Sequence, residues 1–110
     1  MINIHVIDGD AAVRLAARRV LELAGFAVSD APDDTGGAPS CLGLVIADLA
    51  VASLAAIRRR HPAAPILAIG GNLGSLAKPF TPSQLLAAVR LCLARPRFTK
   101  PCATTGRRRR

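Results

Sequence analysis

Tryptophan and tyrosine are absent from this sequence of 110 residues, and phenylalanine occurs three times. Because 51% of the residues are apolar and only 3% are aromatic, a core has to be aliphatic. No apolar run approaches the roughly 18–20 residues needed to cross a bilayer. The first ten residues, MINIHVIDGD, have no basic segment ahead of their apolar run, so they do not resemble a secretory signal. We expect one small cytoplasmic domain with a modest core and no membrane association.

Cysteine is scarce as well. Cys41, Cys92 and Cys102 are odd in number and do not have the spacing of metal ligands. We therefore expect spacers and core residues rather than a metal site, in a reduced cytoplasmic setting.

Acidic residues are missing from one end of the chain. The net charge of +8 suggests nucleic-acid binding, but residues 95–110 hold seven of the fifteen basic residues and none of the seven acidic ones. The sequence therefore predicts a folded domain over residues 1–95 and a disordered basic tail over 96–110. The arginine run can bind phosphates non-specifically, in a salt-dependent way, through Arg107, Arg108, Arg109 and Arg110. A dedicated nucleic-acid-binding protein is the weakest hypothesis, because no recognition helix or basic folded face accompanies the tail.

Strand and helix patterns alternate along the remaining sequence. Apolar, β-branched runs predict strands at 2–7, 26–30, 42–47 and 65–69, with a brief fifth strand at 75–77. Helical periodicity predicts helices over 11–24, over 54–61 and from 82 onward. Good helix caps occur at Asp10, Ser53 and Thr81, and Gly25 suits the end of the first helix. A long helix between the second and third strands is not expected, because PDDTGGAPSC holds two prolines and two glycines.

This alternation predicts a parallel sheet covered by helices on both faces. In such sheets the functional crevice lies at the carboxyl ends of the strands. Polar residues and glycines follow the predicted strands there: Asp8, Asp10, Asp48, Gly70, Gly71 and Lys78. Carboxylates that lie close together repel, so we expect them to share a hard cation such as Mg²⁺.

A carboxylate beside such a cation can attack a phosphoryl donor and form an acyl phosphate, which a lysine then stabilises. Taken alone, Asp48 suits a turn or a helix cap, and Lys78 suits an ordinary surface position. Because both are expected at the same edge of the sheet as Asp8, an active-site position is favoured for Asp48 and for Lys78. Asp10 is equally suited to a metal and to a helix cap. His5 is expected to be a strand residue near an edge rather than a phosphodonor or ligand.

Four stretches, in this order, resemble the receiver domains of bacterial two-component response regulators over about residues 2–94. They are HVIDGDAAVR, LGLVIADLA, PILAIGG and KPFTPSQLLAAV. The resemblance implies a flavodoxin-like, doubly wound α/β fold with a parallel five-stranded sheet of order 2-1-3-4-5. It also implies that Asp48 is the phosphoacceptor, that Lys78 contacts the phosphoryl group, and that the bond to Pro79 is cis. Asp8, Asp10, Asp48 and the main-chain carbonyl of Ala50 would hold Mg²⁺.

The sequence departs from the receiver pattern at several positions. Gly9 stands where the family has a second acid, Gly70 where it has a hydroxyl, and Ser75 where it has an aromatic switch residue. Only NLGSLA separates Gly71 from Lys78, so we expect the fourth helix to be missing or disordered, and the second helix to be reduced. Any switch would have to use the loop with Gly70, Gly71 and Ser75.

Two functional hypotheses follow from the resemblance. One is a receiver that takes a phosphoryl group onto Asp48 from a histidine kinase or phosphotransfer protein and signals by protein–protein contact. The other is a pseudo-receiver of the same fold that acts as an interaction module without phosphorylation. Neither is an enzyme beyond self-phosphorylation and self-dephosphorylation. No output domain follows, so we expect a separate output protein, and a monomer or weak dimer.

Overall fold

The computed structural model describes residues 1–35, 41–70 and 76–94. Along the chain, the elements are β1 (Asn3–Ile7), α1 (Ala11–Leu23), β2 (Ala27–Ala31), β3 (Leu44–Asp48), α2 (Leu54–Arg60), β4 (Ile66–Ile69) and α3 (Pro82–Ala94). Every strand pair is parallel, and the sheet order is β2-β1-β3-β4. The prediction of a doubly wound parallel α/β fold is confirmed. The folded elements end at Ala94, and the predicted basic tail lies outside the described residues.

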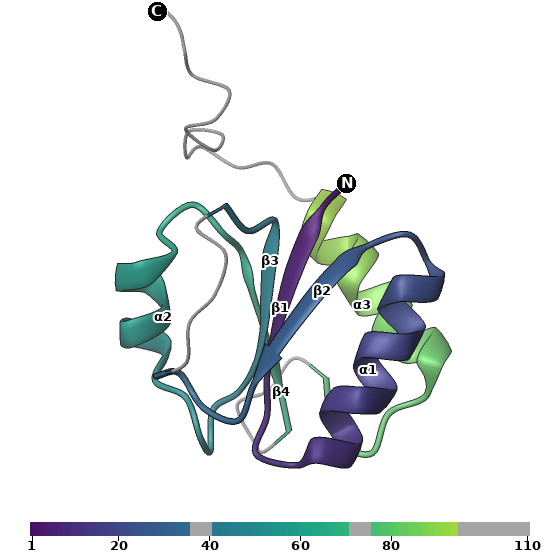
Figure 1. The fold of residues 1–110 in the computed structure, drawn as a ribbon, viewed down its shortest axis with the longest axis horizontal. Coiled ribbons are helices and arrows are strands. Elements are labelled where there is room, and N and C mark those ends of the chain that lie inside the picture. The colour runs from purple at the N-terminus through teal and green to yellow at the C-terminus, as the bar shows by residue number, and fades with distance from the viewer. Residues whose placement is uncertain (36–40, 71–75, 95–110) are drawn as a thin grey trace, which may run out of the picture.

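The helices cover both faces of the sheet, as Figure 1 shows, with α1 and α3 on one side and α2 on the other. β3 lies between β1 and β4, and its first four residues are all buried. An apolar run without alternation is typical of a strand whose two faces are both covered. The same reasoning explains why β1, which lies between β2 and β3, is buried over its last four residues.

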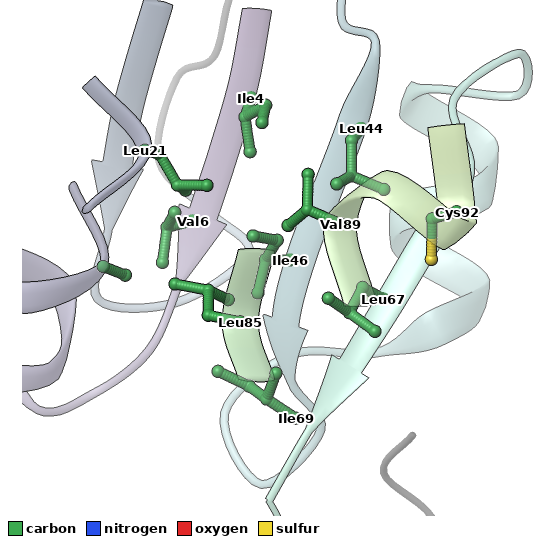
Figure 2. Packing of buried hydrophobic residues seen from close by; sticks show 11 residues of the cluster. Ile4, Val6, Leu21, Leu44, Ile46, Leu67, Ile69, Leu85, Val89 and Cys92 are labelled. Carbon is green, nitrogen blue, oxygen red and sulfur yellow. The ribbon is translucent and has the colours of Figure 1, made fainter. Parts of the chain in front are cut away.

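The larger core lies between the sheet and the helix pair α1 and α3, and Figure 2 shows its packing. Strand side chains of β1, β3 and β4 meet the buried faces of the two helices. Its buried members are Ile4, Val6, Ala17, Leu21, Leu44, Ile46, Leu67, Ile69, Leu85, Val89 and Cys92. All of them except Cys92 are aliphatic. We expected an aliphatic core because the sequence has no tryptophan or tyrosine and only three phenylalanines. Cys92 is a core residue, as predicted.

A smaller cluster lies on the other face, under α2. It contains Ile7, Leu42, Val45, Ala47, Ala52 and Ile57. His5 also belongs to β1 and is only 2% exposed. It lies in β1, next to the edge strand β2, which agrees with its expected place as a strand residue near an edge of the sheet. Its Nδ1 lies 2.7 Å from the hydroxyl oxygen of Ser29 on β2.

Helix ends follow the sequence closely. The Asp10 side chain accepts a hydrogen bond from the N–H of Ala12 and caps α1. Gly25, one residue past the C-cap of α1, has a φ of 100°, which few other residues adopt. At α3, Thr81 and Gln84 exchange backbone and side-chain hydrogen bonds as a capping box. These local signals explain why α1 and α3 start where the sequence predicts.

The described part of the chain has no helix between β2 and β3, which agrees with the expected reduction there; residues 36–40 lie outside it. The turn after β2 is held against α2 instead. Asp34 accepts a hydrogen bond from the N–H of Ser53 at 2.6 Å, and Arg60 donates to the Asp34 carbonyl. Hydrogen bonds to one end of α2 and to its last residue therefore fix the turn.

The expected fifth strand is represented in the described residues by a single parallel bridge between Leu76 and Ile69. The N–H of Gly70 donates to the Leu76 carbonyl at 2.9 Å, and the N–H of Leu76 donates to the Ala68 carbonyl at 3.2 Å. The ladder cannot continue far, because Pro79 has no N–H to donate. The predicted loss of the fourth helix concerns residues 71–75, which lie outside the described residues.

Candidate functional site

Two aspartates leave neighbouring strands at the same edge of the sheet. Asp48 is the last residue of β3, and Asp8 directly follows β1. The strands are parallel, and Ile7 pairs with Ala47 in register. The next residue along each strand is therefore one of the two aspartates, and the predicted meeting of Asp8 and Asp48 at the carboxyl edge follows from this register.

Lys78 joins both carboxylates. Its Nζ lies 2.5 Å from Oδ2 of Asp8 and 2.8 Å from Oδ2 of Asp48. The segment that carries it is attached to the sheet edge by the Leu76 bridge to Ile69. The peptide bond between Lys78 and Pro79 is cis, as the resemblance implied. Three residues that are far apart in sequence thus form one ion-pair cluster, which we call the acidic pocket: Asp8, Asp48 and Lys78.

Asp8 is the buried member of the acidic pocket, with only 1% of its surface exposed. Its Oδ1 accepts a hydrogen bond of 2.8 Å from the N–H of Asp10. Its Oδ2 accepts no well-aligned hydrogen bond from any described group, although the Lys78 ammonium is close. This buried carboxylate oxygen therefore depends on the ion pair with Lys78 and retains acceptor capacity beyond it.

Asp48 is the more accessible carboxylate, with 16% of its side chain exposed. Its Oδ1 accepts a hydrogen bond of 2.9 Å from the N–H of Ala50, and its Oδ2 accepts one from Lys78. The hydrogen bond from Lys78, followed by the one from Ala50, lowers the pKa of Asp48 below its usual value. Asp48 is therefore ionised at neutral pH, the state that a carboxylate nucleophile needs.

The Lys78 ammonium stays charged for a related reason. Burial is the largest single influence and lowers the pKa of Lys78, but the hydrogen bond to Asp48 and the close contact with Asp8, with the charges of both, outweigh it. The net result is a pKa above the usual value. The acidic pocket therefore contains two carboxylates and one fixed cation, with one negative charge left over if both carboxylates are ionised.

Gly70 packs directly against the Lys78 side chain. It has a φ of 71°, a conformation that favours glycine. A Cβ atom built at this position would lie 3.2 Å from Cε of Lys78, 3.5 Å from Cδ and 3.6 Å from Cγ. The aliphatic part of Lys78 therefore passes over Gly70 on its way to the carboxylates. The sequence showed that a hydroxyl is absent here, but it did not show this packing.

The position after Asp8 has no side chain. A Cβ atom at Gly9 would meet Cγ1 of Val51 at 3.3 Å, so a second acid there would need Val51 to move. The Asp10 carboxylate, one residue further on, caps α1 through Ala12. Its role as a helix cap is thus present in the structure, and its role as a metal ligand stays a prediction.

Across residues 1–35, 41–70 and 76–94, no group of three or more His, Cys, Asp or Glu side chains is close enough to hold a metal ion. A metal in the acidic pocket would have to rely on two carboxylates, water and main-chain oxygens such as the carbonyl of Ala50. Of the predicted loop residues, Gly70 is at the pocket, while Gly71 and Ser75 lie outside the described residues. The same part of the chain contains no helix that is long and apolar enough to cross a bilayer.

One contact at the pocket was not expected from the sequence. Nη1 of Arg14, on the first turns of α1, donates a hydrogen bond of 2.6 Å to the main-chain carbonyl of Asp8. Arg14 follows the cap residue Asp10 by four positions, which places it above the start of the helix. This spacing from Asp10 was the only sequence signal for the contact. It does not show whether the Arg14 side chain turns back toward Asp8 or extends into water.

The fold is shared with solved receiver domains. The structure is similar to a response regulator receiver protein from Sinorhizobium medicae, with 25% identity, a TM-score of 0.65, and coverage of 84% of this chain and 94% of the other. It is also similar to the non-phosphorylated HemR receiver domain from Leptospira biflexa, with 17% identity, a TM-score of 0.73, and coverage of 93% and 99%. A response regulator receiver domain protein from Clostridium thermocellum is similar as well, with 21% identity, a TM-score of 0.70, and coverage of 84% of this chain and 94% of the other.

No protein-family model matches the sequence, and no curated protein matches it significantly. The similarity is therefore structural, with 17% to 25% identity in these three cases. The chain has the fold of a response-regulator receiver domain, and the resemblance recognised in its motifs is confirmed at that level.

Proposed function

We propose that this protein is a receiver-type signalling module that accepts a phosphoryl group on Asp48. The observation that carries the proposal is the acidic pocket itself. An ionised, partly exposed carboxylate ends β3, and a lysine 2.8 Å away is held by a second, buried carboxylate. That arrangement supplies a nucleophile and a fixed positive charge for the oxygens of an incoming phosphoryl group.

In the proposed transfer, an oxygen of Asp48 attacks the phosphorus of a phosphohistidine. The new P–O bond forms as the P–N bond breaks, and the leaving imidazole takes up a proton from solvent. Asp48 is ionised beforehand, so no base has to remove a proton from it. Lys78 then pairs with a phosphoryl oxygen, because the carboxylate of Asp48 loses its own negative charge when the acyl phosphate forms.

The donor set of the pocket fits Mg²⁺. Asp8 offers a buried oxygen without an aligned hydrogen bond among the described groups, and Asp48 offers a second carboxylate. Mg²⁺ commonly binds one or two carboxylates and keeps several waters, so a third acid is not required. When bound, the ion would neutralise charge on the transferred group. Asp8 and Asp48 would hold it, with the Ala50 carbonyl and Asp10 as the further ligands that the resemblance implies.

A phosphorylation-independent interaction module is the second candidate, and a specific observation favours it. Lys78 already pairs with both carboxylates, and Gly70 has no hydroxyl to bind a phosphoryl group. Such an ion-pair cluster can stabilise the fold of a docking domain without taking part in phosphoryl transfer. In either case we expect the chain to act by contact with other proteins rather than as an enzyme with a released product.

The proposed partners are a histidine kinase or phosphotransfer protein on the input side and a separate output protein, with all of them in the cytoplasm. Phosphate binding by the arginine tail would be an accessory property. It would fall steeply with salt and disappear when residues 99–110 are removed.

Acetyl phosphate with Mg²⁺ tests the choice between the two candidates. The phosphoacceptor proposal predicts a mass gain of one phosphoryl group in the wild type and none in Asp48→Asn. An Asp33→Asn variant is a matched control, because Asp33 lies on an exposed turn where it bonds to Thr35. A folded wild type that gains no mass, with a donor protein or with acetyl phosphate, would instead support the phosphorylation-independent module.

A further inference from the structure

Gly70 and Lys78 suggest how entry into the acidic pocket is controlled. Nζ of Lys78 lies against Oδ2 of Asp8, the oxygen without an aligned hydrogen bond from the described groups, and against Oδ2 of Asp48. These are the two carboxylates that a divalent cation would use. A cation and the ammonium cannot occupy that place together, because like charges at such distances repel strongly.

The side chain reaches this place because Gly70 leaves room for it. Three carbons of Lys78 lie within 3.2–3.6 Å of the point where a Cβ atom would stand on residue 70. A contact of 3.2 Å to Cε is tighter than ordinary packing, so a Cβ atom at residue 70 would push the end of the lysine by a few tenths of an ångström. The hydrogen bond from the Gly70 N–H to the Leu76 carbonyl fixes the distance between the two segments, so the backbone cannot easily move away instead.

We propose that Gly70 is a positioning residue that seats Lys78 as the resident counter-ion of Asp8 and Asp48, so that a divalent cation binds only when Lys78 moves out. The inference rests on the acidic pocket of the proposed function, and it adds a determinant of cation affinity. It means that this pocket is closed by its own lysine in the resting state. The affinity for Mg²⁺ is then set partly by residue 70, which is not itself a ligand.

The experiment measures Mg²⁺ binding from the amide NMR shifts of residues 8–10 and 48–50 in the full chain. Gly70→Asn is the informative variant, because asparagine tolerates a positive φ better than most residues yet adds a Cβ. Gly25→Asn is its matched control, since Gly25 also has a positive φ but has open space where its Cβ would stand. Lys78→Met removes the ammonium and keeps an unbranched side chain.

We expect Gly70→Asn to bind Mg²⁺ roughly threefold to tenfold more tightly than the wild type, the size expected for weakening one charge-assisted hydrogen bond. Lys78→Met should bind at least about as tightly as Gly70→Asn, because the competing charge is gone. Gly25→Asn should match the wild type. In the Lys78→Met background, Gly70→Asn should add nothing, because its effect acts through Lys78.

A second measurement follows the ammonium itself. The sequence has two lysines, Lys78 and Lys100, so the side-chain ¹⁵N signal of Lys78 can be assigned against a single reference. Mg²⁺ should shift the Lys78 signal in the wild type, and Gly70→Asn should shift it before any Mg²⁺ is added. The Lys100 signal should stay unchanged in both cases.

Three results would overturn the inference and leave the proposed function intact. They are equal Mg²⁺ affinity in the wild type and Lys78→Met, an unchanged Lys78 signal in Gly70→Asn, and tightening by Gly70→Asn that persists without Lys78. If Gly70→Asn does not fold, the comparison of Lys78→Met with the wild type still decides whether Lys78 competes. Absence of Mg²⁺ binding in every variant, Lys78→Met included, would instead contradict the Mg²⁺ dependence of the proposed function.

Discussion

Lys78 and Asp8 form a close ion pair, with Nζ 2.5 Å from Oδ2, and the Asp8 side chain is only 1% exposed. The pair connects the end of β1 to the segment that follows the Leu76 bridge. A buried carboxylate needs such a partner, because an unpaired charge in the interior is costly. The acidic pocket is therefore a structural junction as well as a candidate reactive site, and its residues should affect stability and chemistry in separable ways.

Lys78→Met should lower the free energy of unfolding. Removing one member of a buried pair costs about 3–5 kcal/mol, and the 26% exposure of Lys78 reduces the expected loss to about 2 kcal/mol. Urea unfolding at pH 7 measures it. Glu22→Gln is the control, because it breaks the exposed pair with Arg18 and should cost less than about 0.5 kcal/mol. Equal losses in the two variants would show that the Lys78 pair is no stronger than a surface pair.

Asp10 should act in the cap of α1, and two substitutions separate this from metal binding. Asp10→Ala should destabilise the protein by about 1 kcal/mol, whereas Asp10→Ser, which keeps a capping oxygen, should cost only a few tenths. If Asp10 is a cap alone, Asp10→Ser binds Mg²⁺ as the wild type does. A large loss of Mg²⁺ affinity in Asp10→Ser, with stability retained, would show that the carboxylate is a ligand.

His5 should make stability fall in mildly acidic solution. Burial first, and then the charge of His61, lowers the pKa of His5 below 6.5, while Asp30 opposes this. The unfolded chain therefore binds a proton more readily than the folded one. This contribution to stability is complete above about pH 6.5 and declines as the pH falls below that value.

Urea unfolding between pH 7.5 and 5 measures the effect of His5. In His5→Asn the slope of stability against pH over this range should shrink, leaving the smaller contribution of His61, whose pKa burial also lowers. Asp48 does not interfere, because a carboxyl with a lowered pKa loses its contribution only below about pH 4. An unchanged slope in His5→Asn would contradict the burial of a neutral imidazole.

The packing of α3 on the sheet should dominate its contribution to stability. Leu85 is 1% exposed in the larger core, so Leu85→Ala should cost about 2–5 kcal/mol. Leu91 lies on the same helix and is 61% exposed, so Leu91→Ala should change stability by less than about 0.5 kcal/mol. Thermal or urea unfolding compares the two, and a similar loss in both would mean that α3 does not pack as described.

Much of the fold could be predicted because local and global signals agree. Asp10, Ser53 and Thr81 mark helix starts by their own side chains, and the apolar run Leu44–Ala47 is typical of a strand buried on both faces. The meeting of Asp8, Asp48 and Lys78 followed from parallel topology alone. Their roles in metal and phosphoryl binding stay predictions.

Other features depend on contacts that sequence spacing does not encode. Among the described residues the fifth strand is a single bridge at Leu76, and pairing past it soon meets a proline. The seating of Lys78 over Gly70 depends on where two distant segments approach, and so does the hydrogen bond from Arg14 to the Asp8 carbonyl.

Beryllofluoride with Mg²⁺ mimics a phosphoryl group on an aspartate, so it shows whether Asp48 can accept one. We expect large amide NMR shifts at Asp48 and Ala50 and at Gly70 and Lys78, and none of them in Asp48→Asn. Mg²⁺ alone should give smaller shifts confined to the carboxylates. A wild type that stays folded and shows no beryllofluoride-dependent shift around Asp48 and Lys78 would contradict the claim that Asp48 is a phosphoacceptor.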